Sequence, residues 1–177
     1  MRPHDIVVLL KIMLMNDGWL HKDLASSLRI SNSEISESLN RSVKGRLLAP
    51  DKKTVFKSAL LNFVLHGLKH VFPVEPGQIV KGLPTAHSAP VLKNYFLFDD
   101  YYVWPSPEGS VKGQAISPLY PNQAWAAGHD PKLYEQLALI DALRVGKARE
   151  RQKAEELLKE YLQPQTYARE YSQDQGR

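Results

Sequence analysis

Three segments near the start of the chain place apolar side chains every three or four residues. They span 3–15, 21–28 and 33–43, and polar or turn-forming residues separate them. This spacing is typical of helices that bury one face in a core. Ser31 or Asn32 is placed to cap the third segment, because a side-chain oxygen there accepts a hydrogen bond from a free backbone N–H group. The pattern therefore predicts three short helices in quick succession.

The segment that follows predicts a hairpin and a fourth helix. Leu47–Leu48 and Thr54–Val55 are short strand candidates, and residues 49–53, with a proline and an aspartate at their centre, are typical of a turn. A helix is expected over 57–70, where apolar residues cover more than one face. Such a helix is buried or lies in a subunit interface.

Residues 73–129 differ in composition from the rest of the chain. Eight of the twelve prolines fall here, so regular elements should be short. The segment also carries many large aromatic side chains, which need a surface to pack on. We expect an extended segment with a few short strands or turns, laid over the helical core.

Two helices are predicted toward the C-terminal end. Asp130–Pro131 combines a capping residue with a proline suited to the first helical turn, and a regular apolar stripe follows. Gly146 marks a break, and a last helix is expected over 147–162. Gln163–Pro164 ends that helix, and a polar tail follows.

The stretch LASSLRISNSEISESLNR, residues 24–41, contains the second and third predicted helices with a break between them. A helix-turn-helix needs a small residue in its first helix, apolar residues that fix the crossing of the two helices, and a polar outer face on the second. Ala25 is the small residue. Arg29 stands at the turn, where glycine is frequent, so we expect an unusual backbone conformation there. The apolar positions are Leu24, Leu28, Ile30, Ile35 and Leu39.

With a helix before it and a basic hairpin after it, this stretch resembles the winged helix-turn-helix transcription regulators, broadly of the MarR type. The resemblance covers about the first 70 residues, which is under half of the chain. It implies a mainly α fold with two parts. The first is a winged helix-turn-helix domain over residues 1–72. The second, over 73–177, is an extended proline- and aromatic-rich segment with two C-terminal helices.

The resemblance also implies that the third helix and the hairpin contact DNA. Asparagine and arginine can make paired hydrogen bonds to base edges, serine can bond phosphate or base, and hairpin lysines add sequence-independent phosphate contacts. Glu37 could accept a hydrogen bond from cytosine or pair with Arg41. The outward face of the third helix would present Asn32, Ser33, Ser36, Glu37, Asn40, Arg41 and Lys44. The hairpin would add Arg46, Lys52 and Lys53.

The distribution of charge favours the same segment. The chain has a net charge of +4 and a pI of about 9.2. Residues 1–70 hold eleven Lys and Arg against six Asp and Glu, a net charge of +5, whereas 71–129 sum to −1 and 130–177 to 0. A localised basic face is typical of a polyanion binder, although a solvated surface with spare lysines has the same pattern.

Other chemistries find little support in the sequence. There is no cysteine, so disulfides and thiolate metal sites are excluded, and no apolar run reaches the roughly 18 residues that suggest a membrane span. His66 and His70 lie four residues apart without an acidic partner in that helix, and Asp99–Asp100 is typical of a turn between two aromatic runs. No catalytic motif is present, so we expect neither an enzyme nor a cofactor or metal.

The sequence therefore predicts a cytoplasmic transcription regulator that binds double-stranded DNA sequence-specifically as a homodimer. The alternative is a non-enzymatic adaptor or antitoxin-like protein. It would hold a protein partner with the winged helix and with the aromatic segment around Tyr102 and Trp104. Fold alone does not decide between the two, because winged-helix domains serve both purposes.

Overall fold

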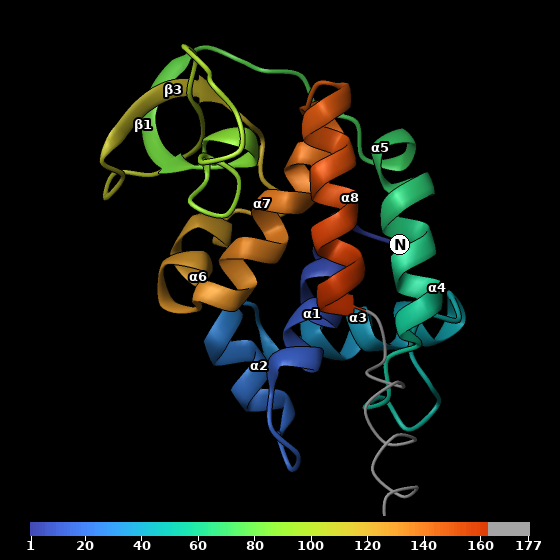
Figure 1. The fold of residues 1–177 in the computed structure, drawn as a ribbon. Helices are drawn as coiled ribbons and strands as arrows, with labels where there is room; N and C mark the ends of the chain where they lie inside the picture. The colour runs from blue at the N-terminus through green and yellow to red at the C-terminus, as the bar shows by residue number, and fades with distance from the viewer. Residues whose placement is uncertain (163–177) are drawn as a thin grey trace, which may run out of the picture.

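Residues 1–162 are described by the computed structural model, in which three helices open the chain (Figure 1). They are α1 (Pro3–Leu14), α2 (His21–Leu28) and α3 (Asn32–Lys44). The Asp5 carboxylate caps α1 by accepting a hydrogen bond from the Arg2 N–H group at 2.7 Å. Ser31 Oγ caps α3 by accepting one from the Glu34 N–H group at 3.2 Å. The three helices predicted from the apolar spacing are confirmed.

The predicted hairpin is reduced to a single β-bridge between Leu48 and Val55. Asp51 holds its turn, because Oδ1 accepts hydrogen bonds from the N–H groups of Lys53 and Thr54 at 2.8 and 2.9 Å. The next helix, predicted as one continuous run, contains a π-helical turn. Its parts are α4 (Lys57–Asn62), η1 (Phe63–Gly67) and α5 (Leu68–Val71). The residues that it buries fully are Leu60, Val64 and Leu68.

A closed three-stranded sheet stands where the sequence predicted an extended segment with a few short strands. The strands are β1 (Ile79–Pro84), β2 (Tyr102–Pro105) and β3 (Val111–Ala115), and a short 3-10 helix, η2 (Ala86–Ser88), follows β1. β1 is antiparallel to both other strands, and β2 and β3 are parallel to each other, so the sheet closes into a small barrel (Figure 1). The predicted mainly α fold class is therefore wrong, and the chain is a mixed α/β protein. Pro84 and Pro105 end their strands, where a missing N–H group is tolerated.

Glycine allows so narrow a barrel to close. A Cβ atom on Gly82 would lie 2.1 Å from the backbone oxygen of Trp104, and one on Gly113 would lie 2.4 Å from that of Tyr101. Only a residue without a side chain lets two backbones approach this closely. Gly82 and Gly113 are thus a condition of this sheet.

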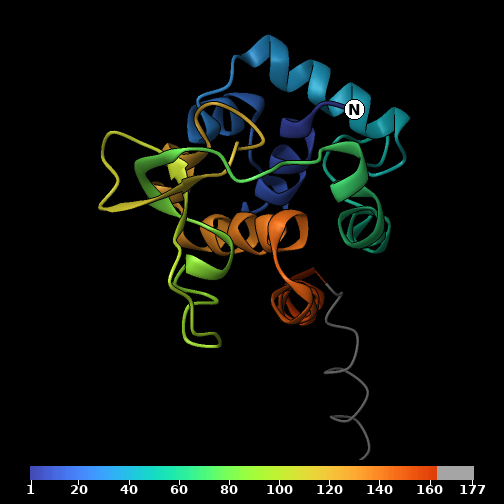
Figure 2. The ribbon, with the colours of Figure 1, turned by 90° about the horizontal axis from the view of Figure 1, so that it is seen from above.

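Three helices, where the prediction had two, complete the described residues. They are α6 (Gln123–His129), α7 (Pro131–Val145) and α8 (Ala148–Leu162). Asp130 caps α7 as predicted, because its Oδ1 accepts a hydrogen bond from the Leu133 N–H group at 3.1 Å. The sequence did not predict α6. Figure 2 shows α3, α1, α7 and α8 stacked in that order. One hydrophobic core runs through these layers, so the N-terminal and C-terminal halves share it.

A buried carboxylate joins the barrel to this core. Asp141 on α7 is fully buried, and its Oδ2 accepts hydrogen bonds from Trp104 Nε1 at 2.5 Å and from Thr85 Oγ1 at 3.0 Å. Arg144 Nη1 donates to Asp141 Oδ1 at 2.7 Å, and Arg144 Nε donates to the Phe72 carbonyl at 3.0 Å. Burial raises the pKa of Asp141, and the charge of Arg144 opposes that shift without reversing it. These bonds fix the barrel at the end of the molecule far from α2 (Figure 1).

Candidate nucleic-acid interface

Helix α3 lies along an outer edge of the molecule, with α1 packed against its inner side (Figure 2). Ile35 and Leu39 on the inner side are completely buried, as are Leu24 and Leu28 of α2. The opposite side of α3 is polar and open to solvent. Its exposed or half-exposed residues are Asn32, Ser33, Ser36, Glu37, Asn40 and Lys44. The predicted division of α3 into a core face and an outward face is therefore present.

The turn between α2 and α3 has the unusual backbone that the sequence predicts. Arg29 adopts the left-handed conformation, with φ 50° and ψ 45°. The Ile30 N–H group then bonds the Ala25 carbonyl at 3.0 Å, which closes the end of α2. A left-handed residue at this position reverses the chain within three residues, so that α3 starts close to the end of α2.

Arg41 is the one predicted DNA-contacting residue whose side chain turns inward. Its Nε donates to Asp5 Oδ2 at 3.0 Å and its Nη2 to Asp5 Oδ1 at 2.8 Å, the fork geometry that suits arginine and carboxylate. Nη2 also donates to Glu34 Oε1 at 2.6 Å. His4 Nε2 lies 2.8 Å from the same oxygen, and Arg2 pairs with Glu34 Oε2 at 2.9 Å. We call these five side chains the Arg41 cluster.

The electrostatics of the Arg41 cluster favour its charged form. Burial disfavours ionisation of Asp5, but the hydrogen bonds from Arg41 and from the Arg2 backbone outweigh it and lower the pKa of Asp5. The hydrogen bond from Arg41 likewise lowers the pKa of Glu34. The hydrogen bonds that Arg41 donates to Asp5 raise the pKa of Arg41 in turn. The cluster thus joins the start of α1 to the middle of α3 by a network of opposite charges.

Glu37 stays on the outward face of α3. The predicted pairing between Glu37 and Arg41 does not form, because the Arg41 guanidinium is bound to Asp5 and Glu34. Glu37 is exposed, and within residues 1–162 no cation lies at ion-pair distance from it. A carboxylate in this position can accept a hydrogen bond from the amino group of a cytosine, but it repels phosphate.

The hairpin after α3 carries the remaining predicted residues. Arg46 and Lys53 are exposed and Lys52 is half-exposed, so all three cations can be reached from solvent. The Lys53 Nζ atom lies 5.9 Å from the centre of the Trp19 ring, which packs the hairpin against the segment before α2. With Lys44, the outward face and the hairpin hold four cations against the carboxylates of Glu37 and Asp51.

The sequence did not indicate that the C-terminal half would contact the helix-turn-helix. Asn122 Nδ2 donates to the Arg29 carbonyl at 3.0 Å, and the Arg29 guanidinium lies 3.8 Å from the centre of the Trp125 ring. A pocket of about 260 Å³ separates the turn from the segment before α6. Its lining includes His4, Ser31, Glu34, Tyr120 and Asn122. These contacts join residues more than 90 positions apart, which no local spacing can reveal.

Other candidate sites stay apart in the structure. Among residues 1–162, no group of three or more His, Cys, Asp or Glu side chains is arranged to hold a metal ion. His66 and His70 are exposed, and so are Asp99 and Asp100. The Arg144 side chain on α7 belongs to the buried Asp141 network. Within the described part of the chain, no helix has both the length and the apolarity that crossing a bilayer requires.

Comparisons with known proteins do not assign a family. No family model matches the sequence, and neither a curated protein nor a solved structure matches it. Function must therefore be inferred from the surface that α3 and the hairpin present.

Proposed function

We propose that the chain binds double-stranded DNA sequence-specifically and regulates transcription, with α3 as the recognition helix of a helix-turn-helix. The observation that carries this proposal is the open outer face of α3. It is polar along its whole length, has Lys44 at its C-terminal end and continues into a basic hairpin. A helix of this kind fits the major groove, where hydrogen-bonding side chains meet base edges and cations meet phosphates.

The open face of α3 would make two kinds of contact with DNA, one with base edges and one with phosphates. Ser36 and Asn40 lie near its middle, and we assign them, with Asn32 and Ser33, to base edges. The phosphate contacts fall to Lys44, Arg46, Lys52 and Lys53. Glu37 would read a cytosine, because its carboxylate can only accept hydrogen bonds when ionised. Arg41 takes a positioning role, since it orients α3 from the inner side and offers no guanidinium to the groove.

We further propose a homodimer in the cytoplasm, with two copies of α3 reading the halves of a pseudo-palindromic site. The run from α4 to α5 is the proposed dimer contact. Phe56 and Val71 are 44% and 53% exposed at its two ends, so large apolar side chains remain uncovered there. A non-enzymatic adaptor or antitoxin-like protein is the second candidate. Trp104, which the sequence assigned to its partner surface, is fully buried against Asp141, so the exposed loop residues Tyr95 and Leu97 would make that contact instead.

The proposal is tested by selecting DNA with the purified full-length protein. Fragments of the source genome are mixed with the protein at low salt, and the bound fragments are sequenced. The expected result is enrichment of a two-fold related motif that the double variant Ser36→Ala, Asn40→Ala no longer enriches. The matched control is Ser110→Ala, which changes an exposed serine between β2 and β3, outside both the proposed DNA interface and the proposed dimer contact. Recovery of fragments without any shared motif, or an unchanged motif for the double variant, would contradict the proposal.

A further inference from the structure

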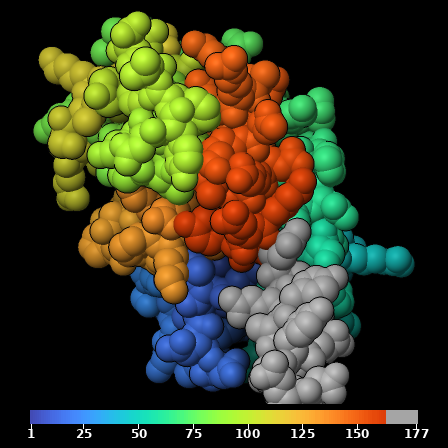
Figure 3. Space-filling model, in the orientation of Figure 1, coloured from blue at the N-terminus to red at the C-terminus, as the bar shows by residue number. Residues whose placement is uncertain are grey.

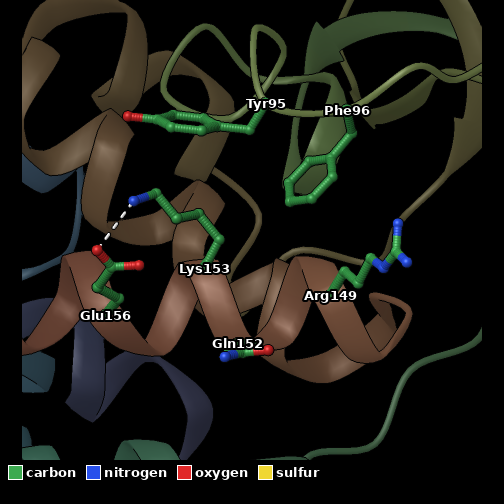
Figure 4. Close-up of a pocket in the computed structure, with 6 residues that line it drawn as sticks. All are labelled: Tyr95, Phe96, Arg149, Gln152, Lys153 and Glu156. Atoms are coloured by element: carbon green, nitrogen blue, oxygen red, sulfur yellow. Dashed lines mark ion pairs between the residues drawn. The ribbon is translucent and has the colours of Figure 1, made fainter.

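The loop after η2 lies beside the start of α8 (Figure 3), and a hollow is present between them. Two adjoining pockets of about 180 and 490 Å³ form it, and they share Tyr95, Phe96 and Arg149. We call it the aromatic cleft. Its loop wall is Tyr95, Phe96 and Leu97, and its helix wall includes Lys147, Arg149 and Lys153. Figure 4 shows the Tyr95 ring above Lys153 and the Phe96 ring facing Arg149.

The loop wall exposes large apolar side chains that nothing in residues 1–162 covers. Leu97 is fully exposed, and Tyr95 is 55% exposed. Exposed apolar side chains that lie together beside a hollow often mark a surface that binds another molecule. A partner that packs an apolar side chain against this wall would bury that surface away from water, which is favourable.

The loop is held in place at its base, so its exposed tip is a defined surface. The Tyr95 N–H group bonds the Leu92 carbonyl at 2.9 Å. The Tyr102 N–H group bonds Ser88 Oγ at 2.8 Å, and His87 Nε2 lies 2.8 Å from the Asp100 carbonyl oxygen. A binding surface that is already ordered loses less conformational entropy when a partner docks.

Two of the three cations named in the helix wall, Lys147 and Arg149, lack carboxylate partners among residues 1–162. Lys153 is paired with Glu156 at 3.0 Å and lies 4.7 Å from the centre of the Tyr95 ring. Glu150 also lines the cleft, but it is buried and its carboxylate accepts a hydrogen bond from the Lys147 N–H group at 2.8 Å. Lys147 and Arg149 are exposed, and neither has an ion-pair partner among residues 1–162. The loop side of the cleft is therefore apolar, and its helix side offers two unpaired cations, Lys147 and Arg149, beside the buried Glu150 and the Lys153–Glu156 pair.

We propose that the aromatic cleft binds a short acidic segment of a partner protein, with an apolar side chain against Leu97 and Tyr95 and carboxylates against Lys147 and Arg149. Charge complementarity selects an anionic partner. A short segment that reaches only Lys147 and Arg149 is favoured over a nucleic-acid strand, because acids near the cleft would repel a continuous run of phosphates. Asp99 and Asp100 follow the loop, and the neighbouring hollow on α8 is lined by the acids Glu155, Glu156 and Glu160. This proposal is independent of DNA binding by α3.

The test uses the full-length protein and synthetic capped peptides. The probe is acetyl-EELFED-amide, and its controls are the charge-reversed acetyl-KKLFKK-amide and the apolar-deleted acetyl-EESSED-amide. Dissociation constants are measured by NMR titration, with oligothymidylate as a separate ligand. The probe is expected to saturate below about 1 mM and to bind at least about tenfold more tightly than either control peptide, as a buried leucine and two ion pairs would produce. Signals of Leu97 and Arg149 should shift with the probe.

Matched variants locate the site. Leu97→Ser and Arg149→Glu should each weaken probe binding about tenfold. Ile79→Ser removes an equally apolar, 73% exposed side chain on β1, and Arg151→Glu reverses an exposed charge on α8 outside the cleft; both should bind as the unchanged protein does. Circular dichroism checks that all four variants fold. Absence of saturation by about 1 mM, tighter binding of oligothymidylate or of a control peptide, or an equal loss in the control variants would overturn the proposal.

Discussion

Arg41 and Asp5 form a two-pronged ion pair that joins α3 to the start of α1, with contacts of 3.0 and 2.8 Å. Asp5 is completely buried and also caps α1, so one carboxylate serves both helices. The pair fixes the rotation of α3 about its own axis. It therefore determines which side chains face outward, and these are the residues to which we assign DNA contact.

Replacing Arg41 should destabilise the whole fold. Arg41→Ala leaves the buried Asp5 carboxylate without its main partner, and breaking such a pair costs about 3 kcal/mol. The measurement is the free energy of unfolding from urea denaturation at neutral pH. Asn40→Ala, one residue away on the open face, should change that free energy by less than about 0.5 kcal/mol. Equal effects of the two substitutions would show that Arg41 is not held as described.

The stability of the protein should fall in acid partly through Asp5. The folded-state pKa of Asp5 lies below its ordinary value because the hydrogen bonds from Arg41 outweigh the effect of burial. The stabilisation is thus fully present above the unfolded-state pKa of about 3.9 and is lost as pH falls through the lower folded-state pKa. Asp5→Asn should be less stable than the unchanged protein at pH 7, and the difference should shrink below about pH 4. The measurement is urea unfolding of both proteins at a series of pH values. If the difference between their free energies of unfolding stayed the same at every pH, Asp5 would play no such part.

The barrel should not accept a methyl group at Gly82. Gly82→Ala would push a Cβ atom to within 2.1 Å of the Trp104 backbone oxygen, and we expect a loss of about 3 kcal/mol or more, or an open barrel. Gly128 in α6 is the control, since a Cβ atom there meets nothing within 4 Å. Gly128→Ala should leave stability unchanged or raise it by up to about 1 kcal/mol. Thermal unfolding followed by near-ultraviolet circular dichroism distinguishes these results, because Trp104 reports on the barrel.

Two substitutions of Arg29 separate the effect of its left-handed backbone from the effect of its side chain. Arg29→Ala and Arg29→Gly both remove the contact with Trp125, but only glycine adopts φ 50° without strain. Arg29→Gly should therefore be more stable than Arg29→Ala by about 1 kcal/mol. Chemical denaturation of the two variants provides the comparison. Identical stabilities would mean that the turn relaxes to another conformation when the arginine is lost.

The helical parts of the fold could be predicted because their signals are local. Caps such as Ser31 and Asp130 act within three residues, and the apolar spacing of α3 separates Ile35 and Leu39 from its polar face. The barrel could not be predicted because its closure depends on distant pairs. Val80 pairs with Gly113 across more than 30 residues, and a glycine at that position suggests a loop when only the sequence is considered. The mainly α prediction failed for this reason.

In the candidate site, too, only the features with a local signal could be predicted. The outward position of Ser36, Glu37 and Asn40 follows from helical periodicity. Periodicity also placed Arg41 on that face, but an acid 36 positions earlier in the chain draws the guanidinium inward. The contact between Asn122 and Arg29 has no local signal at all. A long flexible side chain such as that of arginine can reach several charged partners, so its direction depends on the tertiary structure.

Binding of the full-length protein to DNA over a series of salt concentrations tests the central proposal most directly. Affinity is measured by fluorescence anisotropy for the selected duplex and for a shuffled duplex of equal composition. The double variant Lys52→Ala, Lys53→Ala should weaken binding to both duplexes and reduce the salt slope by about one per lost phosphate contact. Asn40→Ala should keep the slope and lose about 1–3 kcal/mol of preference for the selected duplex. Salt-independent binding, or an Asn40→Ala variant with undiminished preference, would contradict a recognition role for α3.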